Sequence, residues 1–348
     1  MENPPIRICP ETPQQLAEAL HTLATEHRSI RLGGNFSKDR LAYQPGAAQP
    51  ADAIVSTAAM RRLLKYDPRD LTLSVEPGMP FAELERTLAE HRQMLPLDPP
   101  IFQRGSTVGG VIAANLSGPR RRLYGTARDM IIGMTFATLA GKLVQSGGMV
   151  VKNVAGLDMA KLMVGSFGTL AAIATVNFKV FPMPAASRTF AAEFATAAET
   201  FAERDRILGT VLQPSAIDIV NWPRGFRLLV RAQGNAAVLD RFAQELASAQ
   251  IVDESVWDEV REFTPRFLDE HPTGAVVPMS MKLSEMADAF SALRVPAIAR
   301  AGSGMIYAHY AQDPPGVMWN GDFAMMERVK QMFDPERLLN RGRLYGRI

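Results

Sequence analysis

The chain has 348 residues, which is enough for two or three domains and for a core that encloses a sizeable ligand. Hydrophobic residues make up 47% and charged residues 21%, which is typical of a packed globular protein and excludes disorder as the main theme. The 38 Lys and Arg residues nearly balance the 36 Asp and Glu residues, so the net charge of +2 gives no general field for a polyanion. We therefore expect no nucleic-acid partner.

The cysteine content and the apolar runs indicate the cellular compartment of the protein. Cys9 is the single cysteine, so the chain forms no internal disulfide and holds no zinc or iron–sulfur site of its own. Residues 1–5 lack the basic start and apolar stretch of a secretory signal. The longest charge-free run, residues 162–178, contains Gly, Ser, Thr and Asn and is too short to span a membrane. These features predict a cytoplasmic protein.

The first elements in the chain are a predicted strand, helix and strand. Residues 6–9 form a short apolar run, and Thr12-Pro13-Gln14-Gln15 then supplies an N-cap, a proline at the first helical position and a glutamine that completes a capping box. Residues 29–32 are the second strand. This strand leads directly into the glycine loop 33–37, called the first loop below.

Between residues 54 and 182 the pattern is rich in strands with inserted helices. Residues 71–75 alternate like a half-buried strand, and residues 130–139 form an apolar strand that turns into a hairpin at Gly141. Residues 170–181 are a last long strand. Pro182 and Pro184 close it, and we expect the domain boundary there.

The second half predicts a further α+β domain. Residues 191–202 are Ala- and Thr-rich and show no clear pattern. The elements expected after them are helix 199–208, strands 217–221 and 227–232, helix 236–249, strand 274–281, helix 284–293 and strand 297–310. This spacing indicates an α+β unit packed on the first domain. Residues 322–348 read as a helix followed by an Arg-rich end.

Glycine clusters are the main functional signal. The second loop, residues 105–110, precedes a predicted helix over 108–116 that Ser106 or Thr107 caps, and a helix start with free N–H groups suits a diphosphate. The third cluster comprises Gly147, Gly148, Gly156 and residues 165–169, the latter called the third loop below. Taken singly, each cluster is more often a tight turn than a ligand site.

The sequence contains few other motifs that indicate a catalytic or binding site. No G-x-G-x-x-G follows the first strand, no P-loop or G-x-S-x-G occurs, and the five histidines have no metal-ligand spacing, so we expect no metal. The basic run at residues 120–122 is open to two interpretations, a solvated loop or a contact with phosphates or a partner. Backbone loops without acid–base side chains favour a cofactor that carries its own reactivity.

Together these loops resemble the FAD-binding domain of the vanillyl-alcohol oxidase/PCMH superfamily, and most closely the FAD-binding E subunits of bacterial glycolate oxidase. The segments that carry the resemblance are 31–38, 106–110, 116–121, 125–129, 151–158, 162–170 and 340–345. Segments 117–121, Ser-Gly-Pro-Arg-Arg, and 152–156, Lys-Asn-Val-Ala-Gly, are specific to that subunit type.

The resemblance implies an α+β fold: a PCMH-type FAD-binding domain over 1–183, with subdomains 1–57 and 58–183, and a ferredoxin-like cap over 184–325. A tail, 326–348, returns to the FAD domain. It implies that the first and second loops enclose the diphosphate and that the flavin lies between the domains. The implied cofactor-binding residues are Arg31, Gly33, Gly34, Asn35, Phe36, Ser37, Gly105, Ser106, Thr107, Gly109, Gly110, Asn115, Gly118, Tyr124, Gly125, Arg128, Gly168, Ile173 and Arg343.

Departures from the family refine this expectation. Covalent flavin sites place a histidine in the first loop, which has none here, so we expect noncovalent FAD. Related 2-hydroxy-acid dehydrogenases carry a histidine-rich segment, whereas residues 307–313 contain His309 alone. His309 is the candidate catalytic base, with a packed core residue as the other interpretation.

The resemblance therefore implies an oxidoreductase subunit that takes part in oxidising glycolate, a 2-hydroxy acid, to glyoxylate through FAD. The implied partners are a second FAD-binding catalytic subunit and an iron–sulfur subunit, and the complex could contact the inner face of the cell membrane. Two alternatives stay open: a noncatalytic FAD subunit of the same complex, and UDP-N-acetylenolpyruvoylglucosamine reductase, which would need an NADPH site.

Overall fold

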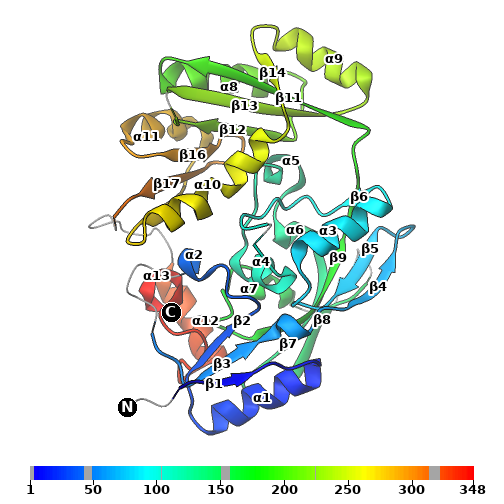
Figure 1. The fold of residues 1–348 in the computed structure, drawn as a ribbon, viewed down its shortest axis with the longest axis vertical. Helices are drawn as coiled ribbons and strands as arrows, with labels where there is room; N and C mark the ends of the chain where they lie inside the picture. The colour runs from blue at the N-terminus through cyan, green and yellow to red at the C-terminus, as the bar shows by residue number, and fades with distance from the viewer. Residues whose placement is uncertain (1–3, 43–48, 103, 150–156, 224, 313–321) are drawn as a thin grey trace.

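The computed structural model describes residues 4–42, 49–102, 104–149, 157–223, 225–312 and 322–348. A seven-stranded sheet with its helices lies at one end of the molecule, and two smaller sheets with the N- and C-terminal helices lie at the other (Figure 1). The α+β prediction is confirmed. No helix within the described ranges is long and apolar enough to cross a membrane.

A three-stranded parallel sheet forms the N-terminal part. Its strands are β1 (Ile6–Ile8), β2 (Ile30–Gly33) and β3 (Ala53–Ser56), in the order β1-β3-β2. Helix α1 (Pro13–Thr25) buries its leucines between this sheet and the next one. Thr12 caps the helix as predicted, but the Gln15 side chain accepts from the Glu11 N–H, so the expected capping box does not close on Thr12.

A five-stranded antiparallel sheet follows in the order β4-β5-β9-β7-β8. Its strands are β4 (Leu63–Asp67), β5 (Thr72–Val75), β7 (Ile131–Ala137), β8 (Leu143–Gly147) and β9 (Ala172–Lys179), and β6 (Gln93–Met94) pairs separately with β10 (Phe181–Pro182). The predicted hairpin is thus β7–β8. Helices α3 (Phe81–Glu90) and α4 (Val108–Ala114) pack their apolar side chains into the core over this sheet.

Short helical turns complete this part of the molecule. They are α2 (Asp39–Ala42), η1 (Thr57–Ala59), α5 (Arg121–Tyr124), α6 (Ala127–Met130) and α7 (Ala160–Met163).

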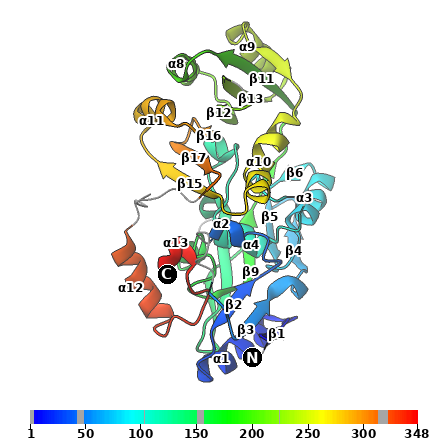
Figure 2. The same ribbon diagram turned by 60° about the vertical axis from the view of Figure 1, so that its left-hand side comes forward.

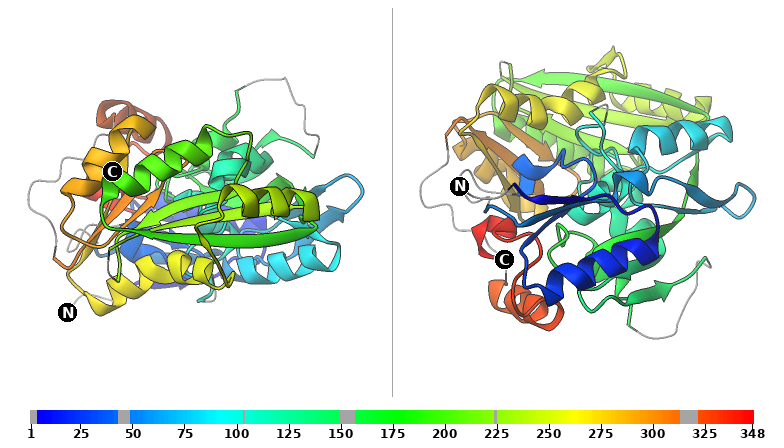
Figure 3. Two further views of the ribbon diagram at one scale, coloured as in Figure 1. Left: turned by 90° about the horizontal axis from the view of Figure 1, so that it is seen from above. Right: turned by 60° about the horizontal axis from the view of Figure 1, so that its bottom comes forward.

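The seven-stranded antiparallel sheet has the order β14-β11-β13-β12-β16-β17-β15. Its strands are β11 (Ala186–Phe194), β12 (Ala216–Val220), β13 (Phe226–Gly234), β14 (Gln250–Val252), β15 (Ala275–Ser280), β16 (Ala297–Arg300) and β17 (Met305–Tyr310). Helices α8 (Ala197–Leu208), α9 (Ala236–Glu245) and α11 (Met286–Ala292), the last preceded by η2 (Leu283–Glu285), cover one face (Figure 3). Helix α10 (Val256–Glu270) packs on the other face.

Three expectations for this sheet were wrong. Residues 191–202 are not featureless, because β11 and α8 lie there and Thr196 starts α8 with a capping box to Glu199. The expected strand over 297–310 is a hairpin, since a turn with Gly304 at φ +69° separates β16 from β17. Helix α10 went unpredicted, and Pro265 lies inside it.

The C-terminal residues lie against the N-terminal sheet (Figure 2). Helices α12 (Phe323–Phe333) and α13 (Arg343–Arg347) flank a segment in which the Asn340 side chain accepts from the Leu32 N–H at 2.8 Å. All strands of the seven-stranded sheet come after β10, so we propose the domain boundary near residue 183. The bounds 184–325 and 326–348 likewise remain proposals.

Candidate functional site

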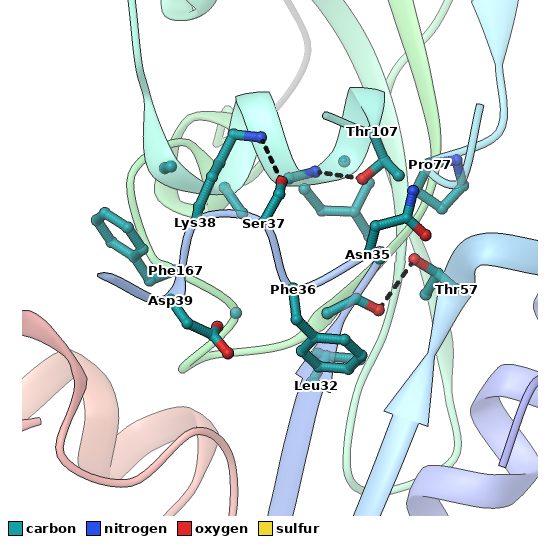
Figure 4. A pocket seen from close by; sticks show the side chains of 18 of the residues that line it. Leu32, Asn35, Phe36, Ser37, Lys38, Asp39, Thr57, Pro77, Thr107 and Phe167 are labelled. Atoms are coloured by element: carbon teal, nitrogen blue, oxygen red, sulfur yellow. Dashed lines mark hydrogen bonds between the residues drawn. The ribbon is translucent and has the colours of Figure 1, made fainter. Parts of the chain in front are cut away.

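A cavity of about 620 Å³, partly open to solvent, lies where the first, second and third loops meet (Figure 4). The predicted cofactor-binding residues that line it are Gly33, Gly34, Asn35, Phe36, Ser37, Thr107, Gly109, Gly110, Gly168, Ile173 and Arg343. The structure thus brings together residues from three distant parts of the sequence.

Close glycine contacts hold the first two loops together. A Cβ on Gly34 would lie 2.3 Å from Thr107 Oγ1, and one on Gly109 would lie 2.6 Å from the Pro77 Cβ. A side chain on Gly34 would push the two loops apart, and one on Gly109 would displace the second loop from the segment between β5 and α3. Asn35 adds a side-chain bond from its Nδ2 to the Gly105 carbonyl at 2.9 Å.

The first loop carries open hydrogen-bond donors. The backbone N–H groups of Asn35, Phe36 and Ser37 make no hydrogen bond to another group within the described ranges. Phe36 has a left-handed backbone with φ +54°, and successive amides around such a residue form a concavity that suits an anion. This loop can therefore supply several donors to a phosphate.

The second loop differs from its prediction. Thr107 does cap α4, and its hydroxyl accepts from the Gly110 N–H at 3.2 Å. The Val108 N–H donates to the Met79 carbonyl and the Gly109 N–H to the Pro77 carbonyl. The expectation of free N–H groups at this helix start was therefore wrong, because the chain between β5 and α3 already uses them.

Lys38, which sequence reasoning did not assign, lies on the cavity wall. It is 7% exposed, and its Nζ donates to Ser106 Oγ at 2.7 Å and more weakly to Ser37 Oγ at 3.4 Å. Burial lowers the pKa of Lys38 to about 7, and Glu262 partly opposes this shift. The available sequence signal was its position directly after the first loop, inside the matching segment 31–38.

Next to Lys38 in the chain, the Asp39 carboxylate is shared by two arginines. Arg31 forms an ion pair with Asp39 and stacks over the Phe36 ring, with 4.8 Å from its Cζ to the ring centroid. Arg343 Nη2 donates to the same carboxylate at 2.8 Å and its Nη1 to the Phe167 carbonyl at 3.0 Å. Arg31 therefore supports the wall from behind, while Arg343 and Asp39 line the cavity.

The third loop is held by the C-terminal segment. Asn340 Nδ2 donates to the carbonyls of Phe167 at 2.8 Å and Gly168 at 3.2 Å. Gly168 has φ +69°, and a Cβ there would lie 2.8 Å from that Nδ2. Gly156 and the segment 152–156 lie outside the described residues.

Several predicted residues lie away from the cavity lining. Asn115 is exposed and ends α4 with φ +48°. Gly118 packs against the Asp98 carbonyl, where a Cβ would come within 2.3 Å, and the Tyr124 ring meets Phe181 edge-on with 5.2 Å between centroids. Gly125 lies next to Asp129, and Arg128 is exposed on α6.

The basic run has an internal partner. Arg120 Nε donates to Asp98 Oδ1 at 2.8 Å in a largely buried ion pair, which holds the pKa of Asp98 well below its usual range. Arg122 packs against Gly302 of the seven-stranded sheet's β16–β17 turn. For Arg120 the structure therefore favours neither a solvated loop nor a contact with phosphates or a partner, because its charge is paired with Asp98.

His309 lies in the core between β17 and α10. Its Nε2 lies 2.8 Å from Thr264 Oγ1, its Nδ1 lies 3.2 Å from the Pro296 carbonyl, and it is fully buried. The rings of Phe263 and Phe267 pack edge-on against it. Burial lowers its pKa to about 4. His309 does not line the cavity, and this placement fits the packed-core interpretation rather than a base that reaches a substrate.

The cavity fits an adenine dinucleotide by the chemistry of its walls. Open amides and a buried lysine amino group lie at or next to the first loop, and Leu32, Ala171 and Ile173 add apolar side chains to the lining. No group of three or more His, Cys, Asp or Glu side chains within the described ranges could hold a metal ion.

Comparison with known proteins agrees with this fit. The family model described as FAD binding domain matches residues 4–147, so the chain carries an FAD-binding domain. The solved structure of alkyldihydroxyacetonephosphate synthase has a similar fold, with a TM-score of 0.72, 18% identity, and coverage of 96% of this chain and 75% of that one.

Relatives of similar sequence include subunits of glycolate oxidase. Glycolate oxidase subunit GlcD of Bacillus subtilis is 28% identical over 62% of this chain and 45% of its own. Glycolate oxidase subunit GlcE of Escherichia coli is 30% identical over 96% of this chain and 98% of its own. The chain therefore belongs to the family of FAD-domain proteins that includes this glycolate oxidase subunit.

Proposed function

We propose that this chain is the FAD-binding subunit of a glycolate oxidase complex and that it holds FAD noncovalently in the cavity between its three loops. The observation that carries this proposal is the convergence of those loops on one cavity whose lining combines anion donors with apolar side chains. The absence of a histidine in the first loop supports noncovalent attachment.

Each wall has a role in this proposal. The amides of Asn35, Phe36 and Ser37 would bind the diphosphate, and the wall beside Gly168 and Ile173 would hold the adenosine half. The residues named earlier outside the lining would support these walls rather than contact the cofactor. When bound, FAD supplies the hydride-accepting and electron-releasing chemistry that the side chains of the cavity lack.

The rest of the proposed complex follows from the family and from the chain's composition. The substrate would be a small 2-hydroxy acid, glycolate, and a second FAD-binding subunit would carry its oxidation. An iron–sulfur subunit would accept the electrons, since Cys9 alone cannot ligate a cluster that usually needs four cysteines. We propose a cytoplasmic location, with contact to the inner face of the cell membrane through the complex.

A second candidate is an FAD-holding subunit that does no chemistry itself. The observation that favours it is His309, whose two ring nitrogens are engaged by Thr264 and the Pro296 carbonyl in the core. In this alternative the chain binds and orients the cofactor, and the base that takes the substrate's proton belongs to another subunit.

The test is to purify the chain and identify its flavin after acid precipitation. We expect FAD in the supernatant at one per chain; flavin that stays with the precipitate would contradict noncovalent attachment, and no flavin would contradict the proposal. Anaerobic glycolate then separates the candidates: bleaching supports an active chain, and an unbleached yellow protein supports the noncatalytic subunit. Bleaching by NADPH would instead indicate the reductase.

A further inference from the structure

Lys38 has a buried amino group with no carboxylate at ion-pair distance among the described residues. Its Nζ has only the hydroxyls of Ser106 and Ser37 as hydrogen-bond partners, and no carboxylate of the described chain lies within ion-pair distance. Glu262 of α10 acts on it from farther away. A buried ammonium that lacks a carboxylate is costly, so a chain that retains one at a cavity wall has a use for an anion there.

The other cation on the wall is not available in the same way. Arg343 forms an ion pair with Asp39, and Asp39 also pairs with Arg31. The charge of Arg343 therefore has a carboxylate partner within the chain. Figure 4 shows Lys38 extending toward α4, while Asp39 points away from it. Lys38 and the open amides of the first loop therefore form a separate group of donors.

We propose that Lys38 is the charge partner of the diphosphate of the adenine dinucleotide. The inference rests on the proposed function and adds a binding residue to it. Phosphate oxygens can accept from Nζ and from the amides of Asn35, Phe36 and Ser37 together, and charge-assisted bonds of this kind are the strong ones. Because the same cavity is also lined by the apolar side chains of Leu32, Ala171 and Ile173, the bound phosphates belong to a larger molecule.

The structure also explains why this charge is needed. In the second loop, the Val108, Gly109 and Gly110 amides are used by the Met79 and Pro77 carbonyls and by Thr107 Oγ1. The amides at that helix start therefore cannot neutralise the phosphates without breaking internal bonds. Lys38, at 2.7 Å from the Ser106 hydroxyl of the same loop, supplies the missing positive charge on that side.

The test compares Lys38→Met and Lys38→Arg with the natural chain, each stripped of flavin, and measures binding of FAD, ADP and riboflavin by calorimetry. We expect Lys38→Met to weaken FAD and ADP binding by about tenfold to a hundredfold and to leave riboflavin unchanged, with partial retention in Lys38→Arg. Lys282→Met is the control, because Lys282 is exposed and lies in the second domain.

A structural role predicts a different pattern. Loss of a merely structural lysine would lower the melting temperature of the flavin-free chain, whereas our proposal expects that temperature to stay equal or rise. Unchanged FAD and ADP affinity in a folded Lys38→Met variant would overturn the inference. If Lys38→Met does not fold, two other measurements test the inference: FAD binding by Lys38→Arg, and the salt dependence of FAD binding by the natural chain. An FAD affinity that does not change with salt would overturn the inference. Absence of FAD binding by the natural chain would instead contradict the proposed function.

Discussion

Lys38, directly after the first loop, and Lys330 in α12 are both buried lysines, but their surroundings differ. Lys330 Nζ donates to Asp334 Oδ2 at 2.6 Å and to the carbonyls of Thr169 at 2.7 Å and Leu339 at 3.0 Å. The Asp334 carboxylate in turn accepts from the Leu338 and Leu339 amides. Every hydrogen of that ammonium has a partner, and its charge has a carboxylate.

The ammonium of Lys38 lacks such a complete set of partners. Lys38 has two hydroxyls and no carboxylate at ion-pair distance in the described chain, and three adjacent amides are open. The difference teaches that burial alone does not indicate a binding role. A buried charge that is satisfied by its own chain fixes the structure, whereas one left without a counter-charge beside a cavity indicates a ligand.

The largest expected effect comes from breaking the ion pair between Lys330 and Asp334. Lys330→Met leaves the Asp334 carboxylate buried without its cation, and we expect the free energy of unfolding to fall by about 3–5 kcal/mol. Urea titration followed by circular dichroism measures this. A loss below about 1 kcal/mol would contradict the view that Lys330 is structural.

The second prediction concerns how the free energy of unfolding depends on pH because of Lys38. Because burial lowers the pKa of Lys38 to about 7 while an unfolded lysine titrates near 10.4, the unfolded chain binds more protons between these values. Stability therefore rises with pH above 7, by about 2 kcal/mol from pH 7 to pH 9 relative to Lys38→Met. Unfolding curves of the two proteins at both pH values check this, and identical pH slopes would contradict it.

His309 extends the comparison to a neutral buried base. Its folded pKa of about 4 lies below the unfolded value near 6.5, so the stability that it contributes is complete above pH 6.5 and is lost as pH falls toward 4. We expect about 2 kcal/mol of loss between pH 7.5 and pH 5 that is absent in His309→Gln. The same variant should leave FAD affinity at pH 7.5 unchanged; a weaker affinity would place His309 at the cofactor.

The smallest expected effect is on the affinity for FAD. An anion beside Lys38 raises the pKa of its ammonium, so binding takes up a proton and weakens as pH rises above 7. The other groups facing Nζ are Glu262 on α10, which favours the charged form, and the hydroxyls of Ser37 and Ser106. We expect the FAD dissociation constant to rise about fivefold from pH 7 to pH 8.

Lys38→Arg provides the matched comparison for that measurement. An arginine stays charged over this range, so the dissociation constant of the variant should be flat with pH. Equal pH dependence in both proteins would assign the effect to another group.

Local features were predictable from the sequence. Strand β2 runs into the glycines of the first loop, and Thr107 caps α4 as its hydroxyl predicts, because turn and cap chemistry depends on neighbours in the chain. The β7–β8 hairpin follows from the same kind of signal. The β16–β17 turn was missed although Gly302 and Gly304 mark it, because apolar residues on both sides read as one continuous strand.

Nonlocal packing set the limit for the site. The contacts of α10 with the N-terminal half of the chain were not visible in the pattern: Glu262 of α10 accepts from the amides of Ile101 and Phe102, and Arg40 donates to the carbonyls of Leu268 and His271. These contacts join α10 to Arg40, which follows the first loop, and to residues 101 and 102, which precede the second loop. Pro265, which lies inside α10, argued against a helix there, so neither the helix nor these contacts were predicted.

The sequence by itself determined where the three loops lie, since glycines after strands and hydroxyls before helices act through the adjacent backbone. Only the tertiary structure decided which donors remain open to a ligand. The second-loop amides are taken by carbonyls from the segment before α3, and Lys38 is buried by Ser106 and neighbours from distant parts of the chain. Burial and hydrogen-bond satisfaction are properties of packed neighbours, and periodicity does not encode them.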